Sequence, residues 1–280
     1  MNSATVLQRT ANPAVIPFPV LDQDPWTRRI LDQERAQSEL ETGTRIRSSL
    51  LESSRSGETD SLTWASWSRG SRVVGGDFHD VTPRPSGGVD VVVGGLTDKG
   101  LPAALMGAAC LNGVLRAMAA LGPDGGPYEI LTSATLAFTG RWKRPTPPDL
   151  AFARIDGDPM TLSMAQSGHV QIAVRSPDGS VFEPRPRRDN GEASPAPTRE
   201  IAMSLTAGDL ILISTDELTR FARRGSRIFN VARWLGEIDA ATPAEVVAAL
   251  GADVDSWGGD DAPDADITVV AIAVKPHILF

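Results

Sequence analysis

The chain has 280 residues, of which 41% are hydrophobic and 22% are charged. This length suits one large domain or two small ones, and the composition excludes wholesale disorder, collagen and coiled-coil rods. A formal charge of −8 argues against nucleic acid as a partner, because sequence-independent binding requires a basic surface.

The cysteine and histidine content and the distribution of apolar residues narrow the class of protein further. The single cysteine, Cys110, excludes an internal disulfide, and one cysteine with three histidines is a poor set for structural zinc. The chain lacks an uninterrupted apolar run of roughly eighteen residues, and its first twenty residues lack the pattern of a signal peptide. We therefore expect no membrane partner, and we expect a reduced, cytoplasmic protein.

The N-terminal part of the sequence divides into two segments. Residues 1–25 are proline-containing and without a period, which predicts a flexible leader. Residues 26–52 contain no proline and many helix formers, which predicts a helix. Its apolar stripe is thin, so we expect a regulatory or interface helix that lies on a partner surface, such as that of a second copy in a homodimer.

A domain of different character is expected over residues 60–276. Period-two alternation predicts a strand at 62–68, and the segment VVGGDFHD is expected to be a strand that ends in paired glycines and two aspartates. The apolar run 89–96 predicts a buried strand, and the patterns after it predict helices and hairpins in pairs. This order indicates an α+β fold with antiparallel sheets. Further elements are expected at 102–121, 128–140, 150–156, 160–166, 170–176, 180–184, 200–205, 210–215, 227–258 and 267–274.

Acidic residues recur at the predicted strand ends. They are Asp77 and Asp80 in GGDFHD, Asp98 in GGLTDKG, Asp216 in ISTDEL, and Asp264 with Asp266 in DAPDADIT. Carboxylates that converge from several strand ends can hold Mg²⁺ or Mn²⁺, and two such ions can activate a water for attack on a phosphate ester. The alternative is that Asp and Gly mark turns, where Asp caps backbone amides.

The order of the motifs resembles that of the metal-dependent protein phosphatases (PPM, or type 2C), in particular the bacterial branch typified by SpoIIE and RsbU. The resemblance covers roughly residues 30 to 275. It rests on GTRIRSSLL, VVGGDFHD, GLTDKGLPAAL, QSGH, GDLILISTDELTR and ADITVVAIAV, which stand in the family's order. It implies a β-sandwich of two antiparallel sheets flanked by helices and preceded by an N-terminal helix. It also implies Mn²⁺ or Mg²⁺ as cofactor if the site is competent.

The resemblance assigns metal-binding roles to Asp77, Asp80 and Asp216, with Asp77 and Asp216 as the catalytic pair. Two principal ligand positions of the family are lost, because Gly95 stands where the family has its bridging aspartate and Ala265 replaces the first aspartate of its last motif. Asp98, Asp264 and Asp266 lie near these positions, and we include Asp98 and Asp266 among the candidate ligands. The family's later glutamate is Arg220, and its glycine after Asp216 is Glu217.

Three functions follow from these departures. The first is a pseudophosphatase in bacterial signalling that needs no cofactor and acts by binding a phosphorylated or unphosphorylated protein of the anti-sigma-antagonist type, as in partner switching. The second is an active phosphoserine/phosphothreonine phosphatase that uses displaced aspartates. The third is a cleft repurposed for other chemistry, which only His79, Asp98, Glu217 and Arg220 suggest.

Overall fold

The computed structural model describes residues 25–51, 56–71, 74–142, 148–184, 197–198, 200–224, 229–258 and 265–276. The chain separates into two units, Met1–Glu39 and Leu40–Phe280. The predicted N-terminal helix is present as α1 (Pro25–Leu51), which begins in the first unit and ends in the second. The leader expected over residues 1–25 lies, apart from Pro25, outside the described residues.

The second unit contains two antiparallel sheets, as the motif order predicted. Within the described residues, one sheet has the order β1-β2-β11-β10-β7-β8, formed by β1 (Ser56–Glu58), β2 (Leu62–Arg69), β11 (Ile267–Val274), β10 (Leu210–Thr215), β7 (Val170–Arg175) and β8 (Val181–Phe182). The other has the order β3-β4-β5-β6-β9, formed by β3 (Phe78–Pro83), β4 (Val89–Gly95), β5 (Asp149–Gly157), β6 (Met160–Ser167) and β9 (Ile201–Ser204).

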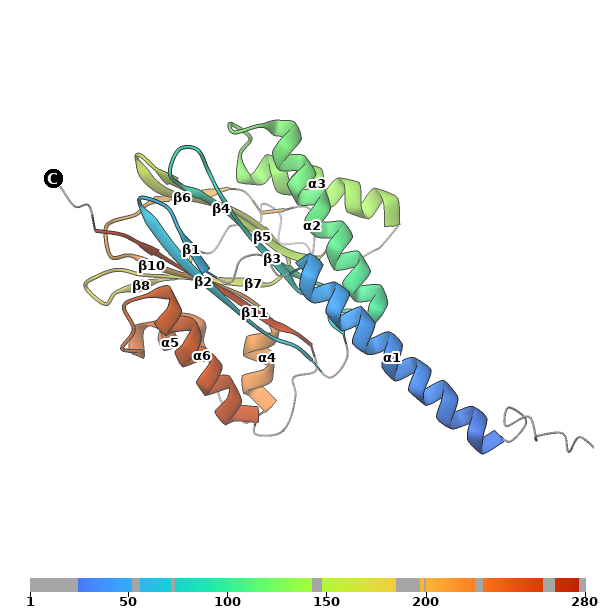
Figure 1. The fold of residues 1–280 in the computed structure, drawn as a ribbon. Coiled ribbons are helices and arrows are strands. Elements are labelled where there is room, and N and C mark those ends of the chain that lie inside the picture. Colours follow the sequence, from blue (N-terminus) through green and yellow to red (C-terminus); the bar gives the residue numbers. More distant parts are fainter. Residues whose placement is uncertain are drawn as a thin grey trace, which may run out of the picture. The chain divides into compact units, whose positions relative to one another are not determined.

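Helices cover the outer face of each sheet (Figure 1). On the β3–β9 sheet lie α2 (Leu101–Leu121) and α3 (Pro127–Trp142), and on the other sheet lie α4 (Glu217–Arg224), α5 (Val231–Glu237) and α6 (Pro243–Gly258). Alternate strand residues divide between two cores. Ile211 and Ile213 of β10 face the other sheet, whereas Leu210 and Leu212 face the helices. The predicted α+β sandwich is therefore confirmed.

Helix α2 has the length and apolar composition of a membrane-spanning helix, although it was not expected to qualify. In the fold one face of it packs into the core, because Cys110, Leu111 and Val114 lie in the hydrophobic cluster between it, α3 and the sheet. Its first turn also meets α1, since a Cβ added at Gly43 would lie 3.3 Å from Cδ1 of Leu101.

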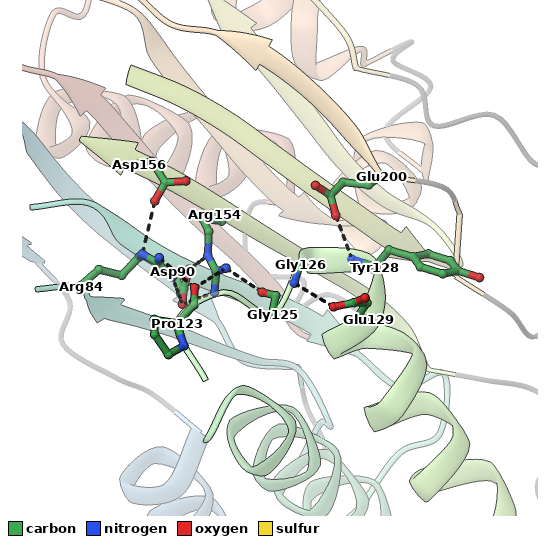
Figure 2. A network of polar contacts seen from close by, with 10 residues as sticks. All are labelled: Arg84, Asp90, Pro123, Gly125, Gly126, Tyr128, Glu129, Arg154, Asp156 and Glu200. Atoms are coloured by element: carbon green, nitrogen blue, oxygen red, sulfur yellow. Dashed lines mark hydrogen bonds and ion pairs between the residues drawn. The ribbon is translucent and has the colours of Figure 1, made fainter. Parts of the chain in front are cut away.

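A buried ion-pair network attaches the turn between α2 and α3 to the sheet (Figure 2). Arg154 of β5 donates from Nε (2.8 Å) and Nη2 (3.1 Å) to the carboxylate of Asp90 in β4, and Arg84 approaches the same carboxylate at 3.2 Å. The remaining donors of Arg154 bind the carbonyl oxygens of Pro123 (3.1 Å) and Gly125 (2.6 Å) in the turn. The network fixes the helix pair over the face of the sheet.

Two details of the sequence prediction were wrong. The segment GGDFHD is not the end of a strand, because residues 74–77 are irregular and β3 begins only at Phe78 and continues beyond Asp80. Close contact with α2 explains the irregular backbone: a Cβ at Gly76 would lie 2.9 Å from the carbonyl oxygen of Ala103. Helix α4 was not predicted as a separate element either, because its eight residues are mostly polar.

Candidate functional site

The site predicted from the aspartates lies at one end of the sandwich, where strands of both sheets terminate. A small cavity of about 30 Å³ is found there. Its lining comes from the start of β3, the end of β4, the start of β5 and the turn from β10 into α4, and comprises Asp77, Gly95, Leu96, Thr97, Asp149, Thr215, Asp216, Glu217, Arg220 and Ala265. The fold thus brings Asp77 and Asp216 together with the two altered positions, Gly95 and Ala265.

Asp77 is buried and its carboxylate occupies the space beside Gly95. A Cβ added at Gly95 would lie only 2.2 Å from Oδ1 of Asp77. The backbone before Asp77 is held by α2, because the carbonyl oxygen of Gly76 would lie 2.6 Å from a Cβ at Gly107. A side chain at position 95 and the observed position of the Asp77 carboxylate therefore exclude each other.

Asp216 lies between β10 and α4, where its carbonyl oxygen accepts hydrogen bonds from the backbone NH groups of Thr219 (3.1 Å) and Arg220 (3.2 Å). Its carboxylate forms an ion pair with Arg220, with Oδ2 and Nε 2.8 Å apart. The two side chains are four residues apart and so lie on the same face of the first helical turn. Asp216 is 24% exposed and Arg220 is 50% exposed. The charge of Asp216 is thus balanced by a residue of its own helix.

One lining acid, Asp149, was missed as a candidate, and another, Glu217, was considered only for the repurposed cleft and not as a metal ligand. The register of β4 with β5 places Asp149 directly opposite Gly95. Oδ1 of Asp149 accepts a hydrogen bond from the backbone NH of His169 (2.9 Å), and a Cβ at Gly168, whose φ is +74°, would lie 1.9 Å from the same oxygen. Asp149 precedes an apolar strand, so the criterion that selected the other aspartates would have found it.

The remaining candidate ligands do not line the cavity. Asp266 is buried, accepts a hydrogen bond from the backbone NH of Ser71 at 2.8 Å, and packs against Gly75. Asp80 accepts a hydrogen bond from the hydroxyl of Thr82 at 2.5 Å. Asp98 is half-buried in the turn before α2, and Asp264 lies outside the described residues. Their metal-binding roles stay predictions.

The described side chains do not fit a pair of divalent ions. Two such ions close together need several carboxylate ligands from converging elements. Within the residues that the structure describes, no group of three or more His, Cys, Asp or Glu side chains is arranged to hold a metal. The four carboxylates of the cavity lining are not arranged as such a group, Gly95 and Ala265 supply no ligand, and Arg220 is already paired with Asp216.

A larger cleft of about 490 Å³ lies beside His169 and Thr219. Its lining is mostly polar, from β6, β7, α4 and the start of α5, and includes Gln166, Gln171, Glu183 and Asn230. Because His169 also donates to Asp149, which lines the small cavity, the two hollows adjoin at the β6–β7 hairpin.

Comparison with known proteins agrees with this fold. The sequence profile of the family described as stage II sporulation protein E (SpoIIE) matches residues 85–275. No curated protein sequence is significantly similar to the chain. Among solved structures, the PP2C domain of SiaA from Pseudomonas aeruginosa is 22% identical with a TM-score of 0.70, and the match covers 86% of this chain and 98% of that one.

Two further structures share the fold. RsbX in complex with magnesium is 14% identical with a TM-score of 0.60, over 79% of this chain and 98% of that one. A Bacillus subtilis SpoIIE structure, comprising the PP2C phosphatase domain and a regulatory fragment, is 14% identical with a TM-score of 0.61. That match covers 78% of this chain and 64% of the SpoIIE chain. The chain belongs to the SpoIIE family of PPM-type phosphatases.

Proposed function

We propose that this protein is a pseudophosphatase of bacterial signalling, which keeps the SpoIIE-type fold and acts by binding a protein partner. The observation that carries the proposal is the ion pair between Arg220 and Asp216, which places a guanidinium beside a carboxylate that the family uses as a metal ligand. Gly95 and Ala265 in the same cavity support it, because neither has a group that coordinates a metal. Without ligated metal, the cavity lacks both an activated water and a clamp for phosphate.

The expected partner is a protein of the anti-sigma-antagonist type, bound through partner switching, as the family resemblance implies. The polar cleft beside the cavity supports this, since Gln166, Gln171 and Asn230 carry amides that can donate to and accept from a polypeptide. The described cavity lining contains four carboxylates and one guanidinium, an excess of three negative charges. Such a lining disfavours a phosphate dianion, so the unphosphorylated partner is the better fit.

Hydrolysis of a phosphoserine peptide in the presence of Mn²⁺ or Mg²⁺ tests the proposal. The wild-type protein is expected to release phosphate no faster than the blank, and Asp216→Ala to behave alike. Asp178→Ala is the matched control, because Asp178 is an exposed turn aspartate that does not line the cavity. Robust Mn²⁺-dependent hydrolysis by the wild type and Asp178→Ala, lost in Asp216→Ala, would overturn the proposal.

The second candidate is an active Mg²⁺- or Mn²⁺-dependent phosphatase. One observation favours it: Asp149 and Glu217 line the same cavity as Asp77 and Asp216 and offer carboxylates that the family motifs do not include. Activity by this route requires Arg220 to leave Asp216. Loss of hydrolysis in Asp98→Ala would further implicate a displaced aspartate, and unchanged hydrolysis would weigh against Asp98 as that ligand.

A further inference from the structure

The position of Arg220 suggests how part of the cavity's negative charge is offset. The lining contains the acids Asp77, Asp149, Asp216 and Glu217, and Arg220 is the only basic residue in the described lining. Carboxylates gathered in a hollow between two sheets repel one another, and an opposite charge within about 4–6 Å relieves that repulsion. In this cavity the opposite charge is the guanidinium 2.8 Å from Asp216.

The geometry of the helical turn places the guanidinium beside Asp216. Asp216 and Arg220 belong to one helical turn, whose backbone bonds join the carbonyl of Asp216 to the NH groups of Thr219 and Arg220. A guanidinium presents its donors in a rigid planar fork and stays charged at all ordinary pH values. It therefore carries its positive charge at every ordinary pH, and in this structure that charge lies beside Asp216.

A second observation, independent of Arg220, concerns space. The Asp77 carboxylate lies where a side chain at position 95 would begin, 2.2 Å from the Cβ position of Gly95. The Asp77 carboxylate therefore packs against the backbone of Gly95, and it occupies the space that an aspartate side chain at position 95 would need. The cavity itself, at about 30 Å³, has room for little more than one water molecule.

We propose that Arg220 is the resident counter-cation of this cavity, replacing a divalent metal at Asp216 and excluding Mn²⁺ and Mg²⁺ from it. The protein then folds and keeps its binding surface independently of metal. The inference concerns the same cavity as the proposed function, but it is tested by metal response and not by hydrolysis. It predicts that removal of the Arg220 charge converts the cavity into a cation site.

The experiment measures the thermal unfolding midpoint of the full chain in EDTA and at increasing Mn²⁺ concentration. The wild-type midpoint is expected to be the same throughout. Arg220→Glu is expected to unfold at a lower temperature in EDTA, because one more carboxylate joins the cavity, and to be stabilised by Mn²⁺. Its apparent Mn²⁺ affinity should be about tenfold or more above that of the wild type, since a neighbouring positive charge has been exchanged for a negative one.

Two variants serve as controls. Arg220→Lys keeps the charge and should remain unresponsive to Mn²⁺. Arg233→Glu breaks an exposed ion pair of the same spacing on α5, where Arg233 Nε lies 2.7 Å from Glu237, and should also remain unresponsive. If Arg220→Glu does not fold, Arg220→Gln removes the charge without adding another, and it should also be stabilised by Mn²⁺, with a smaller gain in affinity.

The inference is overturned if the wild type is stabilised by Mn²⁺ as strongly as Arg220→Glu, or if neither Arg220→Glu nor Arg220→Gln responds to Mn²⁺. The two proposals fail differently. Mn²⁺-dependent hydrolysis by the wild type would refute the pseudophosphatase function. An unresponsive Arg220→Glu protein with no hydrolysis by the wild type would refute only the role of Arg220.

Discussion

At the scale of single residues, Cys110 is a test of how tightly α2 is packed. The thiol is buried among apolar side chains, and this burial raises its pKa to about 12. We expect it to react with a thiol reagent at pH 8 only as fast as the protein opens, because the thiolate is the nucleophile. Denaturant should make the reaction immediate. Rapid labelling of the folded protein would contradict the packing.

The same raised pKa predicts a pH dependence of stability. The folded protein favours the neutral thiol. The contribution of Cys110 to the free energy of unfolding is therefore fully present below the pKa of the thiol in the unfolded chain, near 9, and it is lost as the pH rises toward 12. The free energy of unfolding of the wild type, relative to that of Cys110→Ala, should therefore fall between pH 9 and 12. Denaturant titrations of both proteins across that interval provide the measurement.

Residue by residue, the sequence located part of the site. Asp77 and Asp216 could be predicted because each adjoins an apolar strand, and strand ends of a sandwich meet at one edge. The direction of a side chain was harder to predict: Asp266 also adjoins a strand, but the backbone of Ser71 and Gly75 folds over its carboxylate. The Arg220–Asp216 pair could not be expected without knowing that a helix begins at Glu217.

At the scale of elements, α2 offers a matched pair of substitutions. Gly107 and Gly113 lie on the same helix, but a Cβ at Gly107 would be 2.6 Å from the carbonyl oxygen of Gly76, whereas nothing lies within 4 Å of one at Gly113. Gly107→Ala should lower the free energy of unfolding by about 1–3 kcal/mol through overpacking. Gly113→Ala should raise it by about 0.5–1 kcal/mol through helix propensity.

Chemical denaturation of the two variants checks this prediction. Because Gly76 precedes Asp77, the Gly107 contact is also what holds the cavity wall in place. Equal effects of the two substitutions would mean that α2 does not approach the 74–77 segment as closely as described.

The ion-pair network of Figure 2 predicts that loss of Arg154 lowers the free energy of unfolding more than loss of an exposed ion pair does. Burial alone lowers the pKa of Arg154, but its hydrogen bonds to Asp90 and the charge of Asp90 raise it above the ordinary value. Arg154→Met leaves the buried Asp90 carboxylate without its main partner and should cost about 3 kcal/mol of unfolding free energy. Arg233→Met, at an exposed pair, is the control and should change little. A loss no greater than that of the control would show that Arg84 alone suffices for Asp90.

Local patterns predicted individual elements well. A threonine followed by a proline, as at Thr242 and Pro243, is typical of a helix start, and α6 begins at Pro243 with the NH of Glu245 bound to the Thr242 hydroxyl at 3.3 Å. Pairing over long distances was not predictable in this way. Residues 200–205 and 210–215 were expected as two successive strands, yet β9 and β10 belong to different sheets, because alternation does not specify a distant partner strand.

At the scale of the whole molecule, the order of six motifs predicted the fold more reliably than any single motif. The interface role of α1 stays a prediction from the sequence. In the first unit, Trp26 is 71% exposed and Leu31 is also exposed, which suits an apolar contact with a second copy.

Self-association through α1 can be measured by sedimentation of the full chain. The wild type is expected to sediment as a dimer of 29.7 kDa chains, and the double variant Trp26→Ser/Leu31→Ser as a monomer. Leu136→Ser, which removes an apolar side chain that is 66% exposed on α3, should leave the dimer intact. A monomeric wild type, or a double variant that still dimerises, would contradict the interface role.

The proposal that this protein has lost the metal centre of its family is tested most directly by calorimetric titration with Mn²⁺ and Mg²⁺, of the wild type and of Asp216→Ala. Because Arg220 neutralises Asp216 and neither Gly95 nor Ala265 can coordinate, we predict no saturable heat from either protein at millimolar metal. Binding of two ions by the wild type that Asp216→Ala abolishes would mean that other carboxylates have rebuilt the metal centre, and the protein would then be an enzyme.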